Sequence, residues 1–112
     1  MKTTTFLGTE LKLNIHIDPI GNMTMDDYDF SVSLYCSTRK IISFNKSELK
    51  RVDSNNYIVT FDTKEIGLGE LKCNIVAHIP DSDFVDGVRT EIVKTCTGLE
   101  IKDVPVPKYI LM

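Results

Sequence analysis

The chain has 112 residues, 42% of them apolar, which fits one domain with a hydrophobic core and excludes a disordered chain. Its 13 Lys and Arg against 16 Asp and Glu give a net charge of −3, which argues against nucleic acid as a partner because phosphate binding needs a basic face. No apolar run approaches the ~20 residues of a transmembrane helix, so we expect no membrane partner, and the N-terminus lacks the apolar core of a signal peptide.

Apolar and polar residues alternate along most of the chain, and a period of two predicts half-buried strands. Turn residues such as Pro19 and Gly21 separate the alternating segments. No long segment keeps a helical period, so the sequence predicts an all-β fold, a single immunoglobulin-like antiparallel β-sandwich of about seven strands over residues 1–103. In chain order we expect strands over residues 11–17, 28–36, 40–44, 48–52, 57–62, 71–79 and 88–96, with residues 99–102 extending the last strand or pairing with it.

The best helix candidate is the segment NKSELKRV, residues 45–52, which overlaps the fourth expected strand. Ser47 could cap a helix there, because a side-chain oxygen at that position accepts a bond from the first turn. The segment is too short to change the predicted class, whichever of the two structures it forms.

Three cysteines, Cys36, Cys73 and Cys96, occupy what look like core positions of the predicted strands. An odd count without a C-x-x-C spacing does not indicate a disulfide framework, and it fits a reducing compartment. We expect free, buried thiols that act as small apolar residues and are inert as nucleophiles. Cys36 and Cys73 could instead face each other across the sandwich, as an immunoglobulin disulfide pair does, although the usual Trp is missing.

The C-terminal residues 104–112, VPVPKYILM, differ from the rest of the chain and form an extended tail in our interpretation. Two prolines block central-strand pairing and favour extended backbone, and four apolar residues follow them. The tail either folds back onto its own domain or docks on a partner or on a neighbouring copy. Its candidate partner-binding residues are Pro105, Pro107, Tyr109, Ile110, Leu111 and Met112.

The stretch IPDSDFVDGVRTE has the acidic spacing of a calcium loop in its first half only. Asp81 and Asp83 would stand at positions one and three of an EF-hand, but Val85 takes position five, where a ligand is needed, and Asp86 takes the glycine position six. The second half is one residue out of register, so we predict a hairpin loop. Gly87 would supply its positive φ.

A second acidic cluster, Asp26 and Asp27, precedes the strand predicted to begin at residue 28. Paired carboxylates can perform acid–base chemistry, but that needs a cleft and a fixed separation, which the sequence does not show. We interpret the cluster as solvated, with weak divalent-ion binding left open if both acidic loops lie at one end of the sandwich. His16 and His78 fall on polar strand faces without a carboxylate at ligand spacing. We therefore predict no metal site, no cofactor and no catalytic residue.

Three segments, GNMTMDDYDFSVSLY, VDSNNYIVTFDTKEIGLGELKCNIVAHIPD and GVRTEIV, resemble small β-sandwich domains of tailed-phage virions. These domains include the N-terminal domains of upper-baseplate proteins and of related capsid accessory and head-fibre proteins, among them those of crAss-like gut phages. The resemblance covers roughly residues 6 to 95 and rests on an NNY turn, a strand that ends in DT, and a Gly-containing bend before a long alternating strand.

The resemblance implies an immunoglobulin-like attachment or adaptor module without catalysis, and it carries over no catalytic residues. Such domains often continue into a fibre, whereas this sequence stops after its tail, so we expect a small adaptor or capsid-decoration protein. Its partners would be other virion proteins or a second copy of itself, and its location the virion, assembled in the bacterial cytoplasm. The alternatives are a carbohydrate-binding module or an accessory domain of a bacterial surface or secretion system. A chain without Trp argues against the carbohydrate alternative.

Overall fold

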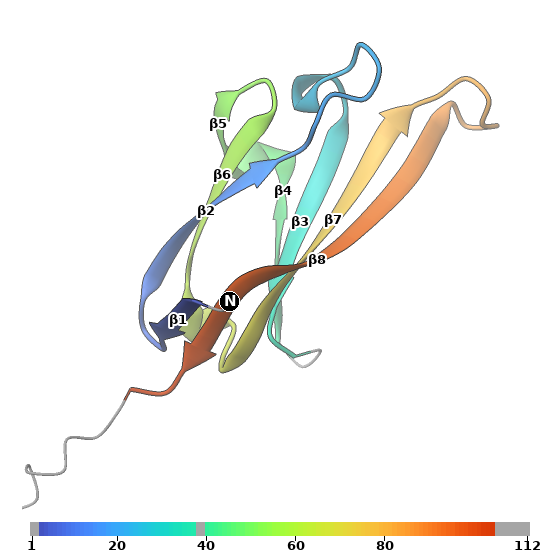
Figure 1. The fold of residues 1–112 in the computed structure, drawn as a ribbon. Helices are drawn as coiled ribbons and strands as arrows, with labels where there is room; N and C mark the ends of the chain where they lie inside the picture. Colours follow the sequence, from blue (N-terminus) through green and yellow to red (C-terminus); the bar gives the residue numbers. More distant parts are fainter. Residues whose placement is uncertain (1–2, 38–39, 105–112) are drawn as a thin grey trace, which may run out of the picture.

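The computed structural model describes residues 3–37 and 40–104, which form two packed β-sheets (Figure 1). The all-β prediction is confirmed, although the described residues contain eight strands rather than about seven. The strands are β1 (Thr3–Phe6), β2 (Glu10–His16), β3 (Asp29–Tyr35), β4 (Ile41–Asn45), β5 (Lys50–Asp53), β6 (Asn56–Asp62), β7 (Gly69–Pro80) and β8 (Val88–Lys102). Three single 3-10 turns join them: Met25–Asp27, Lys46–Glu48 and Thr63–Glu65.

The two sheets differ in width. The larger sheet has five strands in the order β1-β8-β7-β3-β4, and the smaller has three in the order β2-β6-β5. Neighbouring strands are antiparallel except for β1 and β8, which run parallel. The long β7–β8 hairpin forms one side of the molecule in Figure 1, and its loop closes with the Asp81 N–H bonded to the Gly87 carbonyl.

The core lies between the sheets and follows the predicted alternation. Phe30, Val32 and Leu34 of β3 are buried, and the ring of Phe30 packs edge-to-face on Tyr57 of β6, with 5.3 Å between the ring centroids. On β7 every second residue is buried, which gives the set Leu71, Cys73, Ile75, Ala77 and Ile79. Burial of these side chains from both sheets is the main favourable contribution to folding.

Two local predictions need correction, and one of two expected alternatives is confirmed. Strand β1 was not expected, because its sequence TTTF has no alternation and it forms only by pairing with residues 99–102 of β8. Residues 88–102 form one continuous strand, so residues 99–102 extend the last predicted strand, which was one of the two expected alternatives. The helix candidate forms a single 3-10 turn, capped not by Ser47 but by Asn45, whose backbone N–H donates to the Glu48 carboxylate.

The cysteine prediction is correct for Cys73 but wrong for Cys96, which is exposed on β8. Cys36 is half-buried, and its Sγ lies 3.4 Å from the carbonyl of Gly69. All three thiols are free. Leu34 pairs with Cys73 in the register of β3 and β7, and Cys36 directly follows β3. Cys36 and Cys73 therefore lie on the side of the same sheet and do not face each other across the sandwich.

The predicted boundary between domain and tail falls just after β8, which ends at Lys102, and Val104 is exposed. The tail residues 105–112, including all six candidate partner-binding residues, lie outside the described residues. Within the described ranges we find no helix of the length and apolar character needed to cross a membrane.

Candidate functional site

The narrower sheet leaves the inner face of β8 without a strand opposite it. On β7 the inward residues Ile75 and Ala77 are buried, but their neighbours on β8, Val93 and Glu91, are exposed. Val93 retains 48% exposure although it shares the inward face with buried Ile101. The sandwich is therefore open along one side, between the edge of β2 and the inner face of β8.

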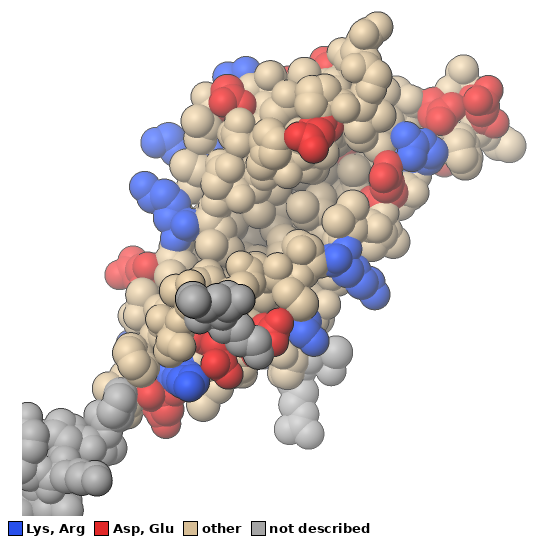
Figure 2. All heavy atoms as spheres, viewed as in Figure 1, with Lys and Arg blue, Asp and Glu red and all other residues tan. Residues whose placement is uncertain are grey.

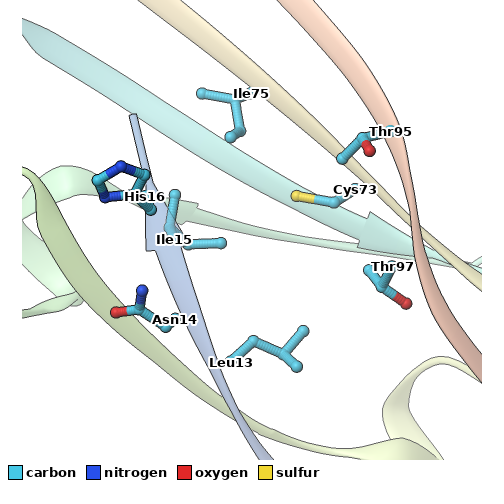
Figure 3. Close-up of a pocket in the computed structure, with 8 residues that line it drawn as sticks. All are labelled: Leu13, Asn14, Ile15, His16, Cys73, Ile75, Thr95 and Thr97. Atoms are coloured by element: carbon cyan, nitrogen blue, oxygen red, sulfur yellow. The ribbon is translucent and has the colours of Figure 1, made fainter. Parts of the chain in front are cut away.

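Two adjoining hollows make this side a groove. One has a volume of about 250 Å³ and the other about 360 Å³, and both are lined by His16, Ile75 and Thr95. The side chains of Ile15 and Cys73 point toward each other from opposite sheets (Figure 3). Figure 2 shows uncharged atoms on the floor of the hollow and charged side chains at its margin. The remaining lining residues are Leu13, Asn14, Ile17, Asp18, Ile20, Tyr28, Ala77, Ile79, Glu91, Val93 and Thr97.

Both strands that border the groove have unpaired edges. The Ile17 N–H donates to the Asn55 carbonyl at 3.4 Å, and the Thr63 N–H donates to the Thr9 carbonyl at 3.1 Å. Because alternate residues of an antiparallel strand point their N–H and C=O to opposite sides, the odd-numbered residues of β2 bond to β6 and the even-numbered ones point to the free edge. Among the described strands none pairs with that edge, and β1 covers β8 only over residues 99–102.

The groove holds a cysteine and a histidine, but their surroundings do not make a nucleophile. Burial raises the pKa of the Cys73 thiol to about 11, so it stays protonated at neutral pH. Both ring nitrogens of His16 are engaged elsewhere, Nε2 with Asp18 at 2.9 Å and Nδ1 with Asn56 at 3.1 Å. Those hydrogen bonds raise the pKa of His16. The pair therefore lacks the short contact and the lowered thiol pKa that covalent catalysis needs.

Two carboxylates and a buried tyrosine mark one end of the groove. Tyr28 lies there with the carboxylates of Asp18 and Glu91. The Tyr28 side chain is 3% exposed, and its hydroxyl has no hydrogen-bond partner among the residues that the structure describes. Burial, followed by the charge of Glu91, raises the pKa of this hydroxyl.

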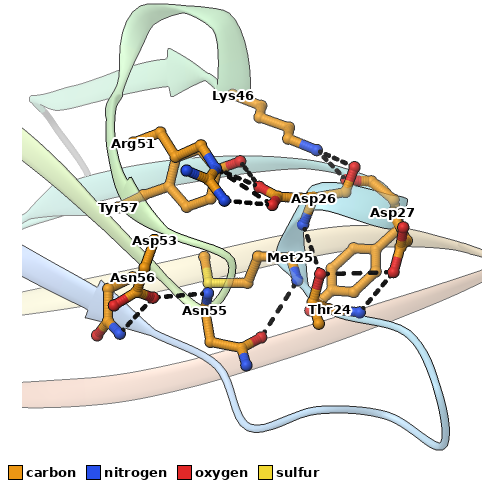
Figure 4. A network of polar contacts seen from close by, with 11 residues as sticks. Thr24, Met25, Asp26, Asp27, Lys46, Arg51, Asp53, Asn55, Asn56 and Tyr57 are labelled. Carbon is orange, nitrogen blue, oxygen red and sulfur yellow. Dashed lines mark hydrogen bonds and ion pairs between the residues drawn. The ribbon is translucent and has the colours of Figure 1, made fainter.

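The first acidic cluster is exposed, and it also joins two parts of the fold (Figure 4). The Asp26 carboxylate accepts hydrogen bonds from Arg51 Nε and Nη2 and from the Tyr57 hydroxyl, the last at 2.6 Å. These bonds, first those from Arg51, lower the pKa of Asp26 to about 2. Asp27 accepts from the Thr24 N–H at 2.8 Å and completes a capping box. Asp26 is exposed, as the solvated interpretation expects, but it also links the approach to β3 with the smaller sheet, which that interpretation did not include.

The second acidic cluster forms the predicted hairpin loop. Gly87 has φ +75°, and the Asp81 carboxylate accepts from the Asp83 N–H at 3.0 Å and faces Arg89 at 3.3 Å. Asp86 accepts from the Val88 N–H at 3.3 Å. Both acidic segments lie toward the same end of the sandwich (Figure 1). The described residues contain no group of three or more metal-ligating side chains, so the two clusters do not combine into one.

The tyrosines are poorly placed to stack on sugars. Tyr28 and Tyr57 are buried, and half-buried Tyr35 donates to Asn74 Oδ1 at 3.2 Å. Tyr109 lies outside the described residues. The aromatic surface that a carbohydrate-binding module requires is therefore not formed by these three side chains.

The groove was missed by the sequence prediction, although one pattern pointed to it. Glu91 and Thr95 are polar residues at inward positions of β8, which indicates that none of the described strands covers this face. Comparisons with protein-family models, curated proteins and solved structures found no match. The described residues define the class as an all-β protein of two packed sheets, with an apolar groove between two unpaired strand edges.

Proposed function

We propose that this protein is a non-enzymatic structural component that binds another polypeptide in the groove between β2 and β8. The observation that carries the proposal is the apolar floor beside a strand edge with outward-pointing N–H and C=O groups. An exposed edge of this kind accepts an extended peptide through main-chain hydrogen bonds, and the pockets beside it select alternate side chains.

The chemistry of the polar side chains supports binding rather than catalysis. The Cys73 thiol has its pKa raised to about 11 by burial, and Asp26 is held by Arg51 and Tyr57. A general base or nucleophile needs a pKa near the working pH and access to a substrate. Neither group meets both conditions.

The proposal also covers the fold family and the biological role of the protein. We propose that the sandwich is immunoglobulin-like and that the protein is a virion component of a tailed phage. In that role it is an adaptor, attachment or capsid-decoration module whose partners are other virion proteins. The support is the resemblance of residues 6 to 95 to such domains, together with two packed sheets and a peptide-sized groove. Assembly then takes place in the bacterial cytoplasm, which suits three free thiols.

Site-specific photo-crosslinking in native assemblies tests the proposal. A benzophenone amino acid is placed in the full chain at Val93, inside the groove, or at Ile92, on the opposite face of the same strand. We expect Val93, but not Ile92, to crosslink to a polypeptide that mass spectrometry identifies as a virion protein, copies of this chain included. The proposal is rejected if neither position crosslinks to protein, or if the crosslinked partner belongs to a surface or secretion system.

A further inference from the structure

We propose that the groove binds residues 105–112 of a second copy of this chain, as a strand antiparallel to β2. This inference rests on the proposed function and names the partner for the same groove. It uses the free edge of β2, the apolar floor and the sequence of a segment that follows the described residues.

The lengths of the segment and the edge agree. Residues 105–112 number eight, and β2 has seven residues. At about 3.3 Å per residue the segment extends to about 26 Å and the edge to about 23 Å. The segment can therefore pair along the whole of β2.

The prolines leave one edge of the segment fit for pairing. Pro105 and Pro107 are two residues apart, so in a strand their missing N–H groups point to the same side. The opposite side keeps the N–H groups of Val106, Lys108 and the later even-numbered residues. Val104 and Val106 precede prolines in the sequence, and a following proline favours extended backbone, which would reduce the entropy lost on docking.

Antiparallel pairing with β2 also sorts the side chains. The even-numbered residues of β2 point their backbone N–H and C=O groups to the free edge. Three of these residues, Lys12, Asn14 and His16, have exposed side chains. Directly opposed residues of an antiparallel pair place their side chains on the same face of the sheet. The even-numbered residues of the segment, with Lys108, therefore lie on the outer face. The inward face carries Pro105, Pro107, Tyr109 and Leu111, which are all apolar like the floor formed by Ile75 and Val93.

The direction of the strands selects a second copy over the protein's own tail. Leu13 lies near Thr97 and Asp18 near Glu91, so β2 and β8 run in opposite directions along the groove. The chain leaves β8 beyond the Thr97 end, so its own tail would enter there and run parallel to β2. In a parallel pair the bonded residues of the two strands have side chains on opposite faces. If the tail paired with β2 through the edge that has N–H donors, the side chain of Lys108 would then point into the apolar groove, where an unpaired charge is costly.

Sedimentation of the full chain tests the association. We expect a concentration-dependent assembly, a two-fold dimer or a longer head-to-tail series, according to whether the exchange is reciprocal. Leu111→Glu and Val93→Glu, both at inward positions, should each weaken it at least about tenfold. The matched controls are Lys108→Ala, at an outward position, and Ile92→Glu, on the other face of β8; both should associate like the unchanged chain. Val93 is 48% exposed, so we expect Val93→Glu to remain folded, which circular dichroism checks.

Mixed isotopes identify the partner and its direction. A full chain with the benzophenone residue at Val93 is mixed with an ¹⁵N-labelled full chain before illumination. We expect crosslinks from the unlabelled Val93 position to labelled peptides from residues 105–112. From a probe at Leu13 the crosslinks should shift toward Leu111, as antiparallel pairing requires.

The inference is overturned if the full chain stays monomeric, or if the crosslinks join Val93 only to its own tail. In that event a crosslink from Val93 to a different virion polypeptide leaves the proposed function intact. The absence of any crosslink to protein rejects both proposals.

Discussion

The hydroxyl of Tyr57 in β6 donates a 2.6 Å hydrogen bond to the carboxylate of Asp26, which precedes β3 of the opposite sheet. Arg51 of β5 donates to the same carboxylate from Nε and Nη2. Lys46 adds bonds to the backbone carbonyls of Asp26 at 3.2 Å and Tyr28 at 2.8 Å. These contacts fix one end of the sandwich and hold Tyr28 at the end of the groove near Asp18 and Glu91.

This joint predicts a specific loss of stability in acid. The pKa of Asp26 is lowered from its ordinary 3.8 to about 2 in the folded protein, so the unfolded chain binds a proton more readily between those values. The contribution is complete above about pH 4 and is lost as the pH falls toward 2. We expect Asp26→Asn to lower the free energy of unfolding at pH 7 and to flatten its dependence on pH between 4 and 2, as measured by urea denaturation. An equal slope in both proteins would show that Asp26 titrates normally.

The two buried tyrosines of this region should respond oppositely to loss of the hydroxyl. Tyr28 has a buried hydroxyl without a partner among the described residues, so Tyr28→Phe should raise the free energy of unfolding by about 1 kcal/mol. Tyr57→Phe removes the bond to Asp26 and should lower it by about 1–2 kcal/mol. Denaturant titration at concentrations where the protein is monomeric measures both. A Tyr28→Phe protein that is clearly less stable would mean that its hydroxyl is hydrogen-bonded in solution.

The core strands could be predicted because a local alternation of apolar and polar residues shows which of their side chains are buried. In the core segments of β3 and β7 an apolar residue stands at every second position, and Phe30, Leu34, Leu71 and Ile75 are buried as expected. Strand β8 was harder, because Ile92 and Val93 are adjacent and leave the phase of the alternation undecided. The structure turns Val93 inward, which places Cys96 on the outer face and explains its exposure.

The site depends on relationships that no local pattern contains. Asp26 is 25 residues from Arg51 and 31 from Tyr57 along the chain, so no local pattern predicts these two contacts. The groove arises because the smaller sheet has three strands against five. The number and order of strands in a sheet are set by pairing between distant segments, and β1 exists only through such pairing.

Calcium should leave the stability of the protein unchanged. In the hairpin loop Asp81 faces Arg89, while Asp83 and Asp86 are exposed and the loop is out of EF-hand register. A specific site at one hundred times its Kd would add about 2.7 kcal/mol, a shift of several degrees in Tm. Scanning calorimetry with millimolar calcium, and with magnesium as the control, checks this. A calcium-specific rise in Tm that Asp83→Ala removes would establish a site in the loop.

The three thiols should react at very different rates in the folded protein. Cys96 is exposed, and we expect it alone to react rapidly with a thiol reagent near pH 8. Burial raises the pKa of Cys36 and raises that of Cys73 to about 11, so both thiols should react slowly with the reagent. We expect Cys73 to react only when the protein unfolds. Cys96→Ser should abolish the fast phase and leave the Tm unchanged, whereas Cys73→Ala should cost about 1–2 kcal/mol through lost burial. Mass spectrometry after timed labelling identifies each modified thiol. Rapid modification of Cys73 in the folded chain would mean that the floor of the groove opens to solvent and that the described packing of Ile15 on Cys73 is not maintained.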